Sequence, residues 1–131
     1  MAKARKKPQG KPKRDEAREK RIYMSIVVDA YDESERAMGW YYYLEDKLHT
    51  PFTARCVGER AISPFRVGDE VEVVGMAPEV ECEREMFVET PWEHRRTLAV
   101  PLSQLEVVRA NEETRQAVED WHYWVGMGYG F

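Results

Sequence analysis

A change of hydrophobic period at Pro51 constrains the fold of this chain more than any other feature. In residues 32–48 the apolar side chains recur at steps of three and four, which places them on one face of an α-helix. They are Ala37, Trp40, Tyr41, Leu44 and Leu48. Pro51 ends the pattern because proline lacks an amide hydrogen and restricts the residue before it. The sequence therefore predicts a helix over 32–48 and a different kind of structure after it.

Five short runs after Pro51 have the composition of β-strands and are separated by proline and glycine turns. The runs are 52–57, 69–76, 82–89, 95–100 and 105–108. In the second run, valines alternate with glutamates, which gives one buried side and one side in water. Five short strands with tight connections predict a small closed or nearly closed barrel.

A second helix is predicted over residues 111–125, near the C-terminal end of the sequence. Asn111 is a favoured N-cap residue, and Glu112 and Glu113 follow it at the positive end of the helix. We therefore expect an α+β fold. Its centre is a Src-homology-3-like antiparallel β-barrel, with the helix 32–48 on its N-terminal side and the helix 111–125 packed on it.

The charge is distributed unevenly along the 131 residues. Residues 1–21 carry a net charge of +7 and residues 22–131 a net charge of −11, which together give the overall −4. The first residues have hardly any apolar side chain, so they cannot offset the entropy cost of ordering. We expect a basic, disordered tail over 1–21, with a short helix over 15–23 joining it to a single domain over 22–131.

The compartment is predicted from what the sequence lacks. No run approaches the roughly 20 apolar residues of a membrane span, and no apolar segment follows the basic N-terminus as in a signal peptide. Cys56 and Cys82 are too few for a disulfide framework, although one bond between them stays open. We expect a cytoplasmic monomer with no membrane contact.

Catalysis finds little support in the sequence. His49, His94 and His122 have large or charged neighbours, and none belongs to a known catalytic spacing. A zinc site from Cys56, Cys82 and a histidine lacks the paired ligand spacing of such sites, and two buried thiols are the simpler interpretation. We therefore predict that the chain is not an enzyme.

The surplus of carboxylates indicates a cation site, because Ca²⁺ takes six to eight oxygen ligands. The candidate clusters lie at 29–35, 45–46, 68–72 and 79–85, and none follows the EF-hand pattern. Ordinary explanations compete: Asp32 and Glu35 have the spacing of a capping box. Glu45 and Asp46 are harder to explain, because acids near a helix C-terminus oppose the helix dipole.

Several longer strings carry a resemblance to a known family. They are DAYDESERAMGWYYYLEDKLHTPFTARC, ISPFRVGDEVEVVGMAPE, MFVETPWEHRRTLAVPLSQLEVV and NEETRQAVEDWHYWV. In this order they resemble the small calcium-binding proteins first described in heterocyst-forming cyanobacteria. The resemblance covers about residues 22–131 and implies a non-EF-hand protein that buffers or senses cytoplasmic Ca²⁺ at an acidic surface.

The resemblance also names candidate Ca²⁺ ligands, taken as the acids inside the matching strings. These are Asp29, Asp32, Glu45, Asp46, Asp69 and Glu70. We expect Asp46 to belong to the tightest site, because a helix end also offers free backbone carbonyls as ligands. The acids of 79–85 lie in a connection and are weaker candidates.

An alternative function uses the barrel as a protein-interaction module and the basic arm as a contact to nucleic acid. Cationic side chains release counterions from a phosphate backbone. The candidates are Lys6, Lys7, Lys11, Lys13 and Arg14. The anionic body opposes this function, because it repels phosphates everywhere except at the arm.

Overall fold

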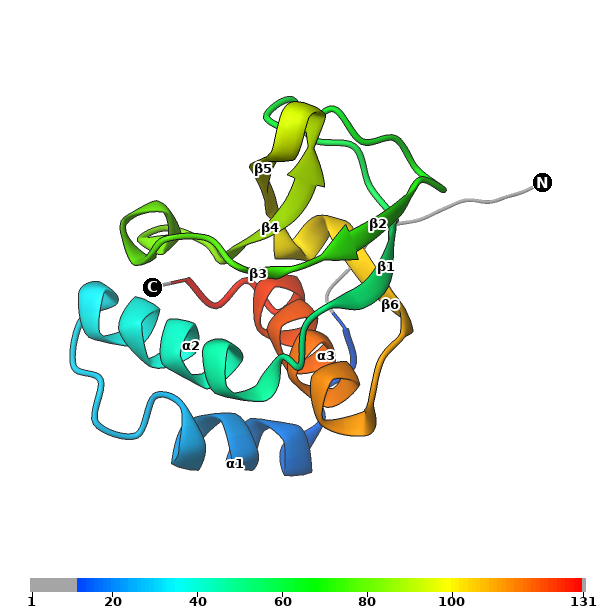
Figure 1. The fold of residues 1–131 in the computed structure, drawn as a ribbon. Coiled ribbons are helices and arrows are strands. Elements are labelled where there is room, and N and C mark those ends of the chain that lie inside the picture. The colour runs from blue at the N-terminus through cyan, green and yellow to red at the C-terminus, as the bar shows by residue number, and fades with distance from the viewer. Residues whose placement is uncertain (1–11, 131) are drawn as a thin grey trace.

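The computed structural model describes residues 12–130 and places three α-helices on one side of two small β-sheets (Figure 1). The helices are α1 (Glu16–Ser25), α2 (Glu33–Lys47) and α3 (Glu112–Gly126). The strands are β1 (Phe52–Cys56), β2 (Glu70–Val73), β3 (Gly75–Met76), β4 (Phe87–Trp92), β5 (Arg96–Pro101) and β6 (Leu105–Arg109). Short 3₁₀ turns lie at η1 (Glu79–Cys82), η2 (Glu93–Arg95) and η3 (Leu102–Gln104).

The two predicted long helices are present, and their first residues show why. The side chain of Asp32 accepts a hydrogen bond from the amide of Glu35 at 2.8 Å and caps α2. Glu35 in turn accepts a hydrogen bond from the amide of Tyr31 at 2.9 Å, so both acids stabilise the start of the helix. Asn111 caps α3 in the same way by accepting from the amide of Thr114.

Within residues 12–130 the strands form two three-stranded antiparallel sheets, ordered β2-β1-β6 and β3-β4-β5. They replace the small closed or nearly closed barrel that we expected. The predicted strand 69–76 divides at Val74. Its first half, β2, pairs with β1, and its second half, β3, pairs with β4. The amide of Val74 donates to the carbonyl of Glu89 at 2.8 Å, so the chain changes partner at this residue.

The predicted strand 82–89 and the turn predicted after it, at Thr90-Pro91, differ from the structure. The chain from 79 to 82 forms η1, and β4 runs through Thr90 and Pro91 as far as Trp92. β3 pairs only with Val88 and Glu89, so the strand beyond them has one unpaired edge. Proline is tolerated at such an edge because its missing amide hydrogen has no partner to lose.

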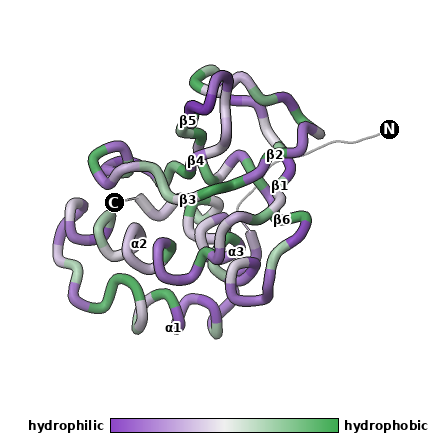
Figure 2. Tube along the Cα trace, viewed as in Figure 1, coloured by the Kyte–Doolittle hydropathy of each residue, from purple (hydrophilic) through white to green (hydrophobic). Residues whose placement is uncertain are grey.

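The core lies between the helices and the sheets, where the predicted apolar face of α2 is buried. Trp40 and Leu44 are fully buried, and Trp40 meets Trp121 of α3 edge-on with ring centroids 5.0 Å apart. Val73 and Val88 contribute buried side chains from the two sheets. Hydrophilic residues colour most of α1 and the outer loops in Figure 2, as expected for surfaces in water.

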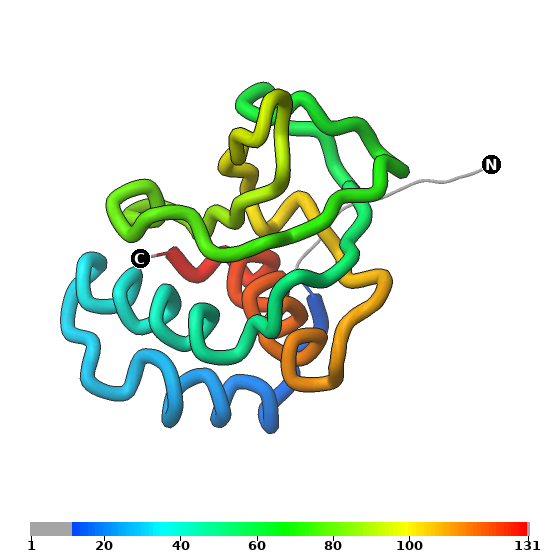
Figure 3. The backbone as a smooth tube through the Cα atoms, in the orientation of Figure 1, coloured from blue at the N-terminus to red at the C-terminus, as the bar shows by residue number. Residues whose placement is uncertain are grey.

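Helix α1 confirms the short helix that we predicted over 15–23, and it overlaps the last residues of the predicted tail. Residues 16–21, assigned to the tail, are part of a helix that lies beside α2 and α3 (Figure 3). The buried carboxylate of Asp120 on α3 accepts hydrogen bonds from Arg18 at 2.8 Å and from Arg21 at 2.6 Å. The hydroxyl of Tyr43 on α2 donates to the same carboxylate at 2.9 Å. One buried acid therefore joins the three helices.

The remaining sequence expectations concern thiols and membranes. Cys56 and Cys82 are both buried free thiols and are not joined to each other. None of the helices within residues 12–130 is both long enough and apolar enough to cross a membrane.

Candidate functional site

The six predicted Ca²⁺ ligands are all exposed, and they lie in three separate places. Asp29 and Asp32 precede α2, Glu45 and Asp46 lie in its last turn, and Asp69 and Glu70 lie at the start of β2. Across residues 12–130, no group of three or more acids, histidines or cysteines is already arranged to hold a metal ion. Carboxylates at any of these places would have to move toward an ion.

The acids before α2 have a structural role in this arrangement. Asp32 is the N-cap of α2, so one of its oxygens is occupied by the amide of Glu35. Asp29 is exposed in the turn between α1 and α2. A cation at this place would share Asp32 with the helix cap.

The acids at the end of α2 point in different directions. Asp46 follows Ala37 by nine residues, which is about two and a half helical turns, so it lies opposite the buried face. Its side chain is 75% exposed, and Lys47 lies 3.6 Å away. Lys47 therefore supplies part of the positive charge that acids at a helix C-terminus require.

Glu45 lies four residues after Tyr41 on α2, so the two side chains share one side of the helix. Burial raises the pKa of Tyr41 first of all, and the negative charges of Glu45 and then Glu79 raise it further. The hydroxyl of Tyr42 donates to Glu79 at 2.9 Å, and this bond together with the charges of Glu79 and Glu45 raises the pKa of Tyr42. The two carboxylates thus act on the same pair of tyrosines, although they are far apart in sequence.

The acids at the start of β2 also lie beside hydrogen-bond donors or positive charges of the protein. Asp69 accepts a hydrogen bond from the amide of Arg66 at 2.9 Å and closes the turn that contains Gly68, whose φ is 97°. Glu70 is paired in register with Arg55 of β1. Arg55 contacts Glu106 of β6 at 3.1 Å, so it supplies a positive charge beside Glu70.

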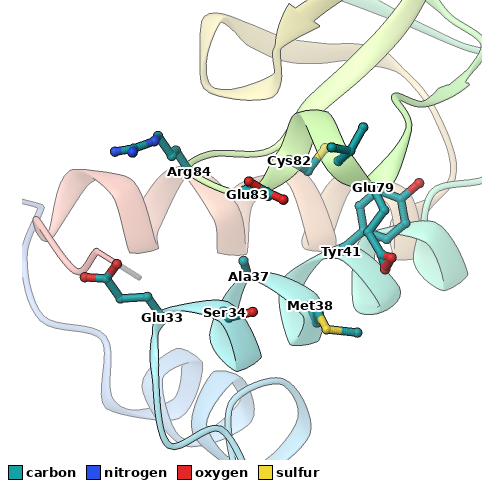
Figure 4. A pocket seen from close by; sticks show the side chains of 10 residues that line it. Glu33, Ser34, Ala37, Met38, Tyr41, Glu79, Cys82, Glu83 and Arg84 are labelled. Carbon is teal, nitrogen blue, oxygen red and sulfur yellow. The ribbon is translucent and has the colours of Figure 1, made fainter.

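A hollow of about 660 Å³ lies between α2 and η1, and the sequence did not predict it. Figure 4 shows Glu33 toward one end of the hollow and Glu79 toward the other, with Glu83 between them. Ser34 and Tyr41 add hydroxyl groups to its lining. The sequence signals for this place were the residues of 79–85, which we ranked as weaker candidates, and Glu33 of the cluster 29–35.

The hollow offers the kind of ligand that Ca²⁺ prefers. Carboxylate and hydroxyl oxygens line it, and Arg84, the cationic side chain among the described residues of its lining, points away from Glu83 in Figure 4. Glu33, Glu79 and Glu83 are exposed, so their side chains can change rotamer. Flexible oxygen ligands of this type suit Ca²⁺ better than Mg²⁺, which demands a stricter octahedron.

His49 and His122 contact residues outside the hollow, whereas Cys82 is one of the residues that line it. His49 contacts Glu113, which also meets Lys47 at 3.3 Å, and these contacts lower the pKa of Glu113. His122 contacts the carbonyl of Leu105, and burial lowers its pKa. His94 is exposed in η2. None of these three histidines lies in a group of metal ligands within residues 12–130.

The basic arm falls mostly outside the described residues. Lys6, Lys7 and Lys11 lie outside them, whereas Lys13 and Arg14 are exposed. Arg14 contacts Glu19 of α1 at 3.3 Å. The nucleic-acid contact predicted for this arm stays a prediction.

Comparison with known proteins identifies the family. The CcbP family model, described as calcium binding, matches residues 20–125. The crystal structure of CcbP from Anabaena is 41% identical, with a TM-score of 0.81 over 94% of this chain and 100% of that one. A calcium-binding protein in its calcium-binding form is also 41% identical, with a TM-score of 0.78 over 90% of this chain and 96% of that one. No curated protein sequence gives a significant match. The chain therefore belongs to the CcbP family of calcium-binding proteins.

Proposed function

We propose that this protein binds Ca²⁺ through the carboxylates on the side of the molecule formed by α2 and η1. The observation that carries the proposal is the 41% identity, over 90% of this chain, to a protein in its calcium-binding form. The acidic lining of the hollow between α2 and η1 agrees with it. The net charge of −11 on residues 22–131 also favours a cation over an anionic ligand.

The ligands that we propose are Glu45 and Asp46 of α2 and Glu79 of η1. Glu45 and Glu79 both raise the pKa of Tyr41, so their negative charges act on the same place. Carboxylates that are held close together repel, and a divalent cation relieves this repulsion. Asp46 follows Glu45 directly, and its exposed side chain can turn toward the same ion or bind a second one. Glu33 and Glu83 extend the acidic surface along the hollow.

The other two predicted pairs are proposed as weaker Ca²⁺ ligands. Asp32 already caps α2, and Asp69 already closes a turn. Each would give up or share a hydrogen bond on binding the ion, which reduces the gain. Within residues 12–130, the side chains of Asp29 and Glu70 cap no helix and close no turn, so they would bind the ion through oxygens that are exposed to water.

Calorimetric titration of Ca²⁺ into paired variants tests the assignment. The pairs are E45A with D46A, D29A with D32N, and D69N with E70A. Asparagine keeps the side-chain oxygen that caps α2 or closes the turn, so the fold is preserved. We expect the first pair to weaken Ca²⁺ binding at least tenfold and the other two to change it less than threefold. An unchanged affinity in the first pair would remove Glu45 and Asp46 from the site.

A control for net charge uses two acids away from this surface. Glu16 lies at the start of α1, and Glu112 at the start of α3, and both are exposed. E16A with E112A removes the same charge as E45A with D46A. If this control weakened Ca²⁺ binding as strongly, the effect would be one of general charge and the site assignment would be wrong.

The role that we propose is buffering or sensing of cytoplasmic Ca²⁺ by a monomer, without catalysis. A dissociation constant in the micromolar range would suit this role, whereas a millimolar one would indicate incidental surface binding. The dissociation constant from the same titration decides between them. Sedimentation velocity with Ca²⁺ and with a chelator checks the monomer, which a Ca²⁺-dependent dimer would contradict.

A further inference from the structure

The turn between β4 and β5 has an unusual backbone. His94 and Arg95 are consecutive, and both have positive φ, 55° and 65°. The amide of Arg96 donates to the carbonyl of Glu93 and closes the turn around them. Residues other than glycine and asparagine are strained in the left-handed region of the backbone. Hairpin turns that need positive φ at both central residues usually contain Asn-Gly. This turn keeps a histidine and an arginine where Asn-Gly would fit with less strain.

The side chains of this turn are fully available to a partner. We call Trp92, His94, Arg95 and Arg96 the β4–β5 tip, which lies at the top of Figure 1 and is strongly hydrophilic in Figure 2. All four residues are exposed, and Trp92 keeps 39% of its surface in water. Strain of this kind persists where surrounding structure holds it, and it clusters at functional sites.

The arginines of the tip differ from most others in the molecule. Arg18, Arg21 and Arg60 each bind a carboxylate within 3 Å. Within residues 12–130, no ion pair joins Arg95 or Arg96 to an acid. Arg66, Arg84 and Arg109 are likewise exposed without an ion pair among the described residues, but Arg95 and Arg96 follow each other directly and so place two guanidinium groups together on a body with a net charge of −11. Guanidinium groups bind carboxylates bidentately, so these two can bind acids from outside.

An aromatic platform supports the tip. The ring of Trp92 meets that of Phe65 edge-on, with centroids 5.9 Å apart and planes at 87°. Phe65 comes from the loop between β1 and β2 and is half-buried. This contact holds the indole in place beside Arg96, its cross-strand neighbour. Exposed tryptophan and arginine side by side are the residue types enriched where protein surfaces bind partners.

We propose that the β4–β5 tip is a contact surface for a carboxylate-rich peptide segment of another protein. Arg95 and Arg96 bind its carboxylates, and Trp92 contacts an apolar residue at its flank. A long nucleic acid is a poorer fit, because it would run along the anionic body with only two arginines to offset its phosphates, whereas a short acidic segment can reach both arginines without crossing that body. The surface is distinct from the α2–η1 side, so this inference does not depend on Ca²⁺ binding.

Fluorescence anisotropy with a fluorescein-labelled deca-glutamate peptide tests the proposal. The full-length protein carries glutamine in place of Lys3, Arg5, Lys6, Lys7, Lys11, Lys13 and Arg14, so that the arm cannot bind the peptide. We expect saturable binding at low salt that weakens as salt rises. R95Q with R96Q should weaken it at least tenfold. The matched control is R84Q with R109Q, two exposed arginines outside the tip, and it should change binding less than twofold.

A second variant separates function from strain. H94N with R95G supplies the residues that the left-handed backbone favours, so the melting temperature should rise. Peptide binding should fall, because one guanidinium is lost. Absence of peptide binding to the arm-neutralised protein would overturn the proposal, as would equal losses in the R84Q and R109Q control. Tighter binding of a labelled deca-thymidine than of the peptide would overturn it in favour of a nucleic-acid surface.

Discussion

Replacing Asp120 by asparagine should destabilise the protein strongly, because this acid holds the three helices together. Its carboxylate is fully buried and accepts hydrogen bonds from Arg18, from Arg21 at two nitrogens, and from Tyr43. Burial first of all, and then the charge of Asp120 and the hydrogen bond to it, raise the pKa of Tyr43 to about 12. The substitution D120N would keep the shape of the side chain but remove its charge.

The size of the effect follows from the burial of the partners. Removing one member of a buried ion pair costs about 3–5 kcal/mol, because the other charge is left without compensation. The side chains of Arg18 and Arg21 keep 21% and 32% of their surface in water, so they can rehydrate in part. We therefore expect the lower end of that range, about 3 kcal/mol of unfolding free energy. For a chain of this length that lowers the melting temperature by roughly 10 °C.

Urea unfolding followed by tryptophan fluorescence measures this loss. The midpoint should fall with little change in the slope, since the surface exposed on unfolding stays the same. The control is D29N, an exposed acid, which should change the unfolding free energy by less than about 0.5 kcal/mol. R21M should cost less in the D120N background than in the wild type, because the two residues form one pair. A D120N protein as stable as wild type, or strict additivity with R21M, would refute the reasoning.

Three further predictions concern pH, packing and the free thiols. Burial lowers the pKa of His122 below its ordinary 6.5, so its contribution to stability is present above pH 6.5 and is lost as the pH falls through the lowered value. H122Q should flatten the plot of urea midpoint against pH in that range, and an unchanged slope would contradict this role of His122. A Cβ on Gly39 would lie 2.3 Å from the carbonyl oxygen of Ile26, whereas one on Gly58 would meet nothing within 4 Å. G39A should therefore cost about 2–3 kcal/mol in urea unfolding and G58A close to nothing, and equal costs would contradict the packing. Burial raises the pKa of Cys82, so it should react with a thiol reagent in the native protein far more slowly than in urea, and equal rates would contradict its burial.

The helices were predictable because their signals are local. Asp32 with Glu35, and Asn111 before two glutamates, give the starts of α2 and α3 within one residue of those observed. Pro51 stops the first of them by its own chemistry. The apolar face of α2 follows from spacing alone, and Trp40 and Leu44 are buried as the period indicates.

The errors come from contacts between distant residues. The helix predicted over 15–23 is present, but its docking on α3 was not predictable, because Arg18 and Arg21 bind Asp120 about 100 positions later. The barrel was not found among the described residues because one strand segment changes partner at Val74, which alternation cannot reveal. Pro91 was taken as the sign of a turn, but it lies within β4, where an unpaired strand edge tolerates it.

The candidate site was predictable as a property of the surface but not as a set of residues. The sequence contains the excess of acids, and the structure shows that the six predicted ligands occupy three places. Glu79 and Glu45 are separated by more than thirty positions, and only the packing of η1 on α2 brings their charges to the same tyrosines. The lower rank of Glu79 followed from its position in a connection, because the sequence cannot reveal this packing.

Thermal unfolding with Ca²⁺, with Mg²⁺ and with a chelator tests the central claim most directly. An ion that binds only the folded protein stabilises it by about 2.7 kcal/mol when present at 100 times its dissociation constant. We predict that millimolar Ca²⁺ at moderate salt raises the melting temperature by several degrees, that equal Mg²⁺ does so far less, and that E45A with D46A reduces the Ca²⁺ shift. Melting curves that coincide in all three conditions would contradict the claim that this acidic surface binds calcium.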